Sequence, residues 1–127
     1  MGRVGKHVLE YLKRELALNK MKVLCIYHKA DLDGVCSAAI VHKEYPNCEL
    51  YGMDYGDGFN WDRLIGVDRV IMVDFSLPLH SMKRLENSID FIWIDHHRSA
   101  IVKFDSYGFW RGRACKSSWV CMFRCEY

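Results

Sequence analysis

Hydrophobic residues follow two different spacings along this chain, and the change from one to the other marks the expected elements. Residues 6–19 carry apolar side chains at helical spacing among charged ones, which predicts an amphipathic helix. The apolar positions are Val8, Leu9, Leu12 and Leu16. From residue 23 to residue 27 the chain is continuously apolar, as in a strand that is buried on both faces. We therefore expect an amphipathic helical extension over residues 1–20 and a domain that begins at residue 21.

The alternation of strand and helix patterns continues after the first strand. Apolar runs typical of strands occupy residues 48–53, 70–73 and 91–94, and helical patterns occupy residues 35–45, 61–65 and 79–87. Pro78 stands at the first turn of the last helix. Strands and helices that alternate in this way form parallel sheets with right-handed crossovers. The sequence thus predicts an α/β, Rossmann-like fold, in which helices flank both faces of an open parallel sheet.

Length, composition and charge limit the classes of protein that fit. A chain of 127 residues, of which 50% are hydrophobic and 27% charged, is typical of one globular domain. The formal net charge of +2 is too small to indicate a nucleic-acid or membrane partner. No apolar stretch approaches the roughly 20 residues that span a bilayer, and no signal-peptide core follows the first residues. These features predict a cytoplasmic protein without a membrane partner.

The six cysteines show no motif of a zinc or redox site. No pair has C-x-x-C spacing, and Cys25 and Cys36 lie inside apolar segments. We expect reduced thiols that act as small core residues.

Acidic residues and histidines follow each expected strand at the point where it ends. In chain order they are His28, Asp31 and Asp33, then Asp54, then Asp74, and finally Asp95, His96 and His97. Ligands of open α/β sheets bind beyond the carboxyl ends of the strands, so these side chains are expected to converge at one edge. Carboxylates gathered in this way repel one another unless a cation compensates them. The pattern therefore predicts a metal site.

The donor types narrow the choice of metal. Mixed histidine and aspartate ligands suit divalent ions such as Mn²⁺ or Fe²⁺, and the lack of cysteine among them argues against structural zinc. This many ligands could hold two ions roughly 3.5–4 Å apart, bridged by one carboxylate, and pairs of that kind usually serve phosphoryl chemistry.

Several of these residues also have ordinary structural interpretations. Asp54 is more simply a helix cap, a turn residue or a residue that orients a ligand, and we leave it out of the metal site. Residues 31–34 could form a capping turn, and residues 95–97 a surface turn. Arg98 could bind a phosphate or be solvated. Residues 55–59 contain glycines but lack a phosphate-binding motif, which favours an ordinary turn.

Three segments resemble known motifs. His28, Asp31, Asp33 and Gly34, then Asp74 after Val73, then Asp95, His96 and His97 after Ile94 look like the first three motifs of the DHH phosphoesterases. This family includes single-strand-specific exonucleases, cyclic-dinucleotide phosphodiesterases, family II pyrophosphatases, and oligoribonuclease-like and exopolyphosphatase-like members. The resemblance covers residues 22–100.

The resemblance implies a role for each residue. His28 and Asp31 would bind one manganese ion, Asp33 and His96 a second, and Asp74 would bridge both, with Mg²⁺ or Fe²⁺ as alternative ions. His97 and Asp95 would be catalytic, His97 facing the scissile phosphate and Asp95 orienting His96. Arg98 is the candidate for substrate binding.

The chain also departs from the family pattern. Relatives carry a fourth-motif aspartate that completes the second metal site, but the only acids after Asp95 are Asp105 and Glu126, in other contexts. Relatives also carry a C-terminal substrate domain. We expect residues 21–127 to be a DHH-type catalytic domain without that second domain, truncated or frame-shifted at its C-terminus.

Two functions of different classes follow. The first is a metal-dependent phosphoesterase that hydrolyses phosphodiester or phosphoanhydride bonds of small nucleotides, short oligonucleotides or polyphosphate. The alternative is a truncated, non-catalytic metal-binding DHH module. Exposed apolar residues at a truncated end would also favour a homo-oligomer.

Overall fold

Five strands form one sheet in which every paired neighbour runs parallel. The computed structural model describes residues 3–100, 102 and 120–122. Its strands are β1 (Val23–His28), β2 (Glu49–Met53), β3 (Arg69–Val73), β4 (Asp90–Asp95) and β5 (Val120–Met122), and its helices are α1 (Arg3–Lys20), α2 (Leu32–Glu44), α3 (Leu79–Ser88) and the 3-10 helix η1 (Trp61–Leu64). The predicted parallel α/β sheet is confirmed.

The order of the strands creates a switch point beside β1. Across the sheet the order is β2-β1-β3-β4-β5, so the chain leaves β1 first to one side and then to the other. Open α/β sheets bind ligands in the crevice beyond the carboxyl ends of the strands at such a point. The loops after β1 and β3 meet there.

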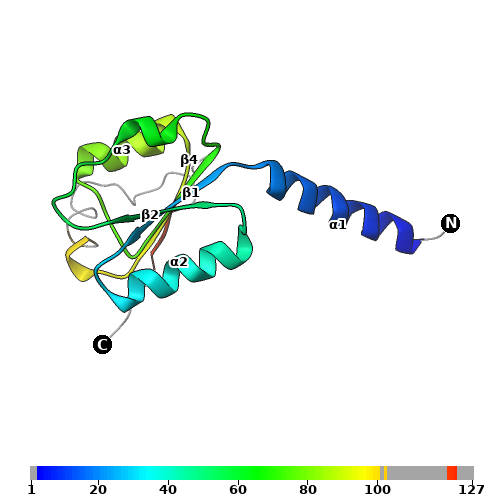
Figure 1. The fold of residues 1–127 in the computed structure, drawn as a ribbon, viewed down its shortest axis with the longest axis horizontal. Coiled ribbons are helices and arrows are strands. Elements are labelled where there is room, and N and C mark those ends of the chain that lie inside the picture. Colours follow the sequence, from blue (N-terminus) through cyan, green and yellow to red (C-terminus); the bar gives the residue numbers. More distant parts are fainter. Residues whose placement is uncertain (1–2, 101, 103–119, 123–127) are drawn as a thin grey trace.

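Alternate residues of β1 serve two separate cores. Leu24 and Ile26 face the side covered by α3, whose Met82 and Leu85 are fully buried. The intervening Val23 and Cys25 face the side covered by α2. Figure 1 shows α2 and α3 on opposite faces of the sheet. A strand that is buried on both faces needs a continuous apolar run, which explains the sequence of β1.

The first helix lies outside both cores. In Figure 1, α1 extends away from the sheet on the side where β1 begins. Its apolar residues Val8, Leu9, Leu12 and Leu16 are at least half exposed. The helix expected from the sequence is present, and its apolar stripe has no partner among the described residues.

Sequence and structure differ at three places. Helix α2 begins three residues earlier than expected, because Asp31 caps it. Strand β5 was not expected, and the other expectations for the C-terminal tail lie outside the described residues. Cys36 is exposed, so its expected core role is wrong, whereas Cys25 is buried. Among the described helices, none is both long and apolar enough to cross a membrane.

Candidate metal centre

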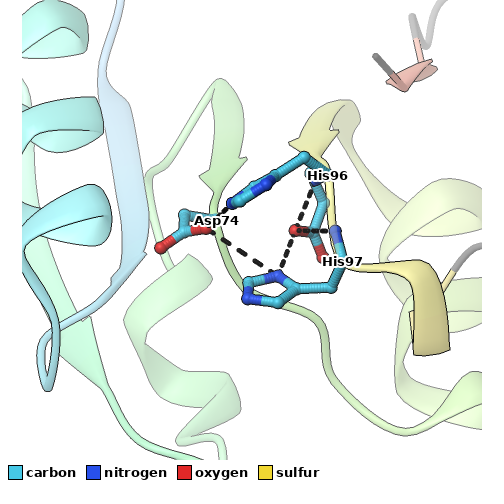
Figure 2. A group of neighbouring side chains, drawn as sticks. Asp74, His96 and His97 are labelled. Atoms are coloured by element: carbon cyan, nitrogen blue, oxygen red, sulfur yellow. Dashed lines mark hydrogen bonds and ion pairs between the residues drawn. The ribbon is translucent and has the colours of Figure 1, made fainter. Parts of the chain in front are cut away.

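The loops that follow β1, β3 and β4 bring the expected ligands together. Two groups of histidine and aspartate side chains have their donor atoms within 4.8 Å of one another. One contains His28, Asp31 and Asp74, and the other contains Asp74, Asp95, His96 and His97. Figure 2 shows the rings of His96 and His97 directed toward the Asp74 carboxylate. Asp74 belongs to both groups.

Asp31 uses one oxygen for the helix and the other for the site. Its Oδ1 accepts a hydrogen bond of 2.8 Å from the Gly34 amide and so caps α2, while Oδ2 lies 2.9 Å from His28 Nδ1. The capping interpretation and the ligand position therefore both hold. A Cβ atom at Gly34 would lie 1.8 Å from the His28 carbonyl oxygen, so glycine alone permits this close approach of α2 to β1.

Asp54 contacts the candidate ligand His28 from the loop after β2. Its Oδ1 lies 3.0 Å from His28 Nε2 and accepts a 2.8 Å hydrogen bond from the Tyr55 amide. Burial of the His28 ring opposes its protonation, but its bonds with Asp54 and Asp31 outweigh burial and raise its pKa. Of the roles open to Asp54, orientation of His28 fits this geometry best.

Tyr55 is a residue of the site that the sequence did not indicate. Its ring centroid lies 5.1 Å from that of His28 and 4.9 Å from that of Phe75. The turn expected over residues 55–59 is present, with a bond of 3.1 Å from the Asp57 amide to the Asp54 carbonyl. The only available signal was its position directly after Asp54 at a strand end.

Asp74 combines a strained backbone with a buried, partly unsatisfied carboxylate. It is the only described residue other than glycine with a positive φ, 52°, a conformation that costs about 1 kcal/mol. Its amide donates to the Ile94 carbonyl at 2.9 Å. The carboxylate is 3% exposed, and its Oδ1 lies 2.8 Å from His96 Nε2. Strain of this kind is retained where the surrounding structure demands it, typically at functional sites.

Asp95 holds the loop that carries the two histidines. Its Oδ1 accepts hydrogen bonds from the backbone amides of His96, at 2.8 Å, and His97, at 3.2 Å. The same oxygen lies 2.5 Å from His97 Nδ1. The ring that Asp95 contacts is thus that of His97, whereas the resemblance implied the ring of His96. This arrangement fixes the ring of His97 and the backbone position of His96.

Two expected site residues are less tightly held. Asp33 Oδ2 lies 4.0 Å from His96 Nε2, and the Asp33 side chain is 74% exposed. Arg98 is exposed at the first residue of a helical segment that follows the histidines. Within the described part of the chain, no hydrogen bond or ion pair joins Arg98. Asp33 therefore lies near the centre. Arg98 directly follows His97 in the sequence but makes no polar contact with the described residues that would place it in the site.

The pKa values of the Asp74 and Asp31 carboxyl groups are shifted in opposite directions. Burial raises the pKa of Asp74, and the nearby carboxylate of Asp31 raises it further. The Gly34 amide holds the pKa of Asp31 below its ordinary value, with help from His28. Burial therefore works against the negative charge on Asp74 in the protein alone.

The family comparison agrees with this geometry. A family model described as the DHH family, N-terminal domain, matches residues 22–125. The chain belongs to the DHH family. The match continues past residue 100, where the resemblance found in the sequence stopped. A comparison with curated proteins and one with solved structures gave no match. Membership of the DHH family points to a phosphoesterase in general and to the use of divalent metal ions.

The residues of this DHH domain fit a divalent cation. In the described part of the chain, Asp74 Oδ2 and Asp95 Oδ2 are buried without a hydrogen-bond partner. A buried acceptor that lacks a partner costs free energy, and a cation removes that cost for the oxygen that it contacts. Carboxylate and imidazole donors suit Mn²⁺, Fe²⁺ or Mg²⁺ better than structural zinc. The identity of the ion does not follow from these donors.

Proposed function

We propose that this DHH domain is a metal-dependent phosphoesterase that hydrolyses phosphodiester or phosphoanhydride bonds. The observation that supports this most directly is the position of Asp74. Its buried carboxylate is shared by two donor groups, and one of its oxygens has no partner among the described residues. A shared carboxylate is the feature that a two-ion hydrolase needs.

In this proposal the first donor group holds one ion, and His96 of the second group holds another together with the nearby Asp33. His28 and Asp31 bind the first ion, Asp33 and His96 bind the second, and Asp74 contacts both. Manganese is the proposed ion. When bound, the pair would activate water as a nucleophile and stabilise charge on the phosphoryl oxygens.

His97 and Asp95 have supporting roles in the proposed reaction. Because the Asp95 carboxylate accepts the proton on His97 Nδ1, the Nε2 atom of His97 is left to face the substrate. In its protonated form, Nε2 donates a hydrogen bond to an oxygen of the scissile phosphate. Arg98 is the proposed contact for a second phosphate, as a bidentate donor.

The alternative is a metal-binding module without turnover. It is favoured by Asp33, whose exposed side chain reaches only to 4.0 Å from His96 Nε2. A second ion held by fewer or weaker ligands would leave the first ion bound without completing the hydrolase.

The experiment that separates these functions measures ions and turnover together. The manganese-loaded chain is analysed for metal content and assayed on bis-p-nitrophenyl phosphate, and then on dinucleotides, short oligonucleotides and tripolyphosphate. We expect two ions per chain and hydrolysis that Asp74→Asn lowers by about 10³-fold, since metal ions contribute several kcal/mol to such reactions.

Asp62→Asn provides the control, because Asp62 lies on η1, away from the site. It should leave both ion content and turnover unchanged. One ion per chain without turnover would establish the metal-binding module instead. A chain that binds no ion would contradict both functions.

A further inference from the structure

A pocket adjoins the metal centre on the side of β2. It has a volume of about 280 Å³ and lies between the loops that follow β2 and β3. Residues 55–57 line one wall and residues 75–78 line the other. Since His28 contacts Tyr55 and Asp74 directly precedes Phe75, the pocket opens next to the proposed ions. A group attached to the scissile phosphate would reach it.

Tyr55 gives the pocket a prepositioned aromatic surface. The residue is 53% exposed, while its ring also packs against Phe75, which is buried, and against His28. The three rings hold one another in place, so little side-chain entropy remains to be lost on binding. A half-exposed ring that is fixed in this way is suited to stacking with a planar partner.

The hydroxyl groups around Tyr55 make the pocket amphipathic. Tyr55 and Ser76, which both carry hydroxyl groups, line the pocket together. Leu77 and Pro78 add apolar surface to the opposite wall. Apolar walls with a few fixed polar groups are typical of sites for organic ligands.

The charge of the pocket argues against a polyphosphate chain. Among the described residues that line it, Asp57 is the only charged one. Its carboxylate accepts a 2.9 Å hydrogen bond from the Asp54 amide and lies 3.4 Å from Lys29 Nζ, outside the lining. A polyanion needs cationic donors, whereas an exocyclic amine of a base can donate to a carboxylate.

We propose that this pocket receives the base of the nucleotide that carries the scissile phosphate, with Tyr55 as its stacking surface. The inference rests on the proposed phosphoesterase and narrows its substrate class to nucleotides and short oligonucleotides, leaving polyphosphate out. Tyr55 is then a specificity residue, since it contacts the base and not the reacting phosphorus.

The test compares two ligands that differ only in the base. Binding of AMP and of ribose 5-phosphate to the manganese-loaded chain is measured by isothermal titration calorimetry. Stacking on an aromatic side chain contributes about 1–3 kcal/mol per base, so AMP should bind about 5-fold to 150-fold tighter. Tyr55→Ala should make the two affinities equal, and Tyr55→Phe should keep the difference.

Tyr11→Ala is the matched control, because Tyr11 is an exposed tyrosine on α1, outside the site. It should preserve the preference for AMP. Tyr55→Leu keeps apolar bulk without an aromatic ring, so it gives the same answer if Tyr55→Ala does not fold. Circular dichroism checks the fold of each variant.

The outcomes distinguish the subsite from the catalytic proposal. Equal affinities for AMP and ribose 5-phosphate in the unmodified chain, together with hydrolysis of phosphodiesters, would overturn the base pocket and leave the phosphoesterase intact. A preference for AMP that survives in Tyr55→Ala would also overturn it. If neither compound binds and no phosphodiester is cleaved, both proposals fail.

Discussion

The two edges of the sheet solve the problem of buried charge in opposite ways. At the edge where the strands begin, the partly buried Asp90 and the exposed Asp68 each accept a hydrogen bond. Asp90 Oδ2 accepts a 2.7 Å hydrogen bond from Arg69 Nε, and Arg69 also donates to the Tyr45 hydroxyl at 3.1 Å. Asp68 accepts a 2.8 Å bond from the Lys22 amide. Both carboxylates at this edge therefore have hydrogen-bond donors from the protein itself, and we call it the complete edge.

At the edge where the strands end, acids lie beside acids. Asp74 faces Asp31 across the site, and the nearest positively charged partners are histidines, which are charged only when protonated. Buried oxygens of Asp74 and Asp95 lack partners in the described residues. This edge is incomplete until it binds a cation.

The edge where the strands begin is arranged for stability, and the edge where they end is arranged for function. A sequence selected only for stability would pair or remove the charges at both edges. Among the described residues, the strained backbone of Asp74 and the unpaired carboxylate oxygens occur only at the edge that lies over the switch point of the sheet. Removing a charge should therefore destabilise the protein where the strands begin and stabilise the metal-free protein where they end.

The largest expected effect comes from breaking the close approach at the strand-end edge. Gly34→Ala places a Cβ atom 1.8 Å from the His28 carbonyl oxygen, so either α2 or β1 must move. Overpacking usually costs 1–3 kcal/mol, and we expect about 3 kcal/mol here, with loss of metal binding. Urea denaturation and metal titration measure both. In Gly58→Ala nothing lies within 4 Å of the new Cβ, and an equal loss there would refute this explanation.

A smaller effect is expected from opening the complete edge. Arg69→Met leaves Asp90 partly buried without its partner, which should lower the free energy of unfolding by about 1–2 kcal/mol. The metal content should not change, since this pair lies at the far end of β3. Arg63→Met removes the exposed pair with Glu49 and should cost less than about 1 kcal/mol. Equal losses in the two variants would remove the distinction between buried and exposed pairs.

The smallest effect has the opposite sign. In the metal-free protein, Asp74→Asn removes a charge that burial and Asp31 both disfavour, so stability at pH 7 should rise by about 1 kcal/mol. A carboxyl group whose pKa is raised by folding favours the folded state only when it is protonated. The advantage of the variant should therefore shrink as the pH falls through the raised pKa toward the ordinary value of 3.8.

With manganese bound, the unmodified chain should be more stable than Asp74→Asn. At a free concentration 100 times its dissociation constant, an ion stabilises the protein that binds it by about 2.7 kcal/mol, and Asp74→Asn should lose most of this gain. Chemical denaturation at pH 7 and pH 4, with and without manganese, measures all four conditions. A metal-free variant less stable than the unmodified chain at pH 7 would contradict the idea of an incomplete edge.

Most of the fold could be predicted from sequence because its strands are continuous apolar runs. Strands β1, β3 and β4 differ from the expected runs by no more than one residue at either end. Helix α2 began earlier than its apolar pattern, because a side-chain cap and not hydrophobicity decides its first turn. Strand β5 has only three residues, too few for a periodic pattern to be detected.

The sequence predicted which residues gather at the site, but not which of their side chains contact one another. Residues at strand ends converge whenever the strands are parallel, which is why Asp31 and Asp74 were expected together. The contact of Asp95 with the ring of His97, and the packing of Tyr55 on His28, depend on χ angles that no spacing in the sequence fixes. The assignment of individual ligands stays a prediction.

The two carboxylate oxygens of Asp31 connect the metal centre to a backbone amide that can report whether a cation is bound. One oxygen holds the Gly34 amide at the start of α2, and the other faces His28. A cation that draws electron density from the second oxygen weakens the first as an acceptor. The proton resonance of a single backbone amide, at Gly34, should therefore register whether the centre is loaded, without any substrate and without any assay of turnover.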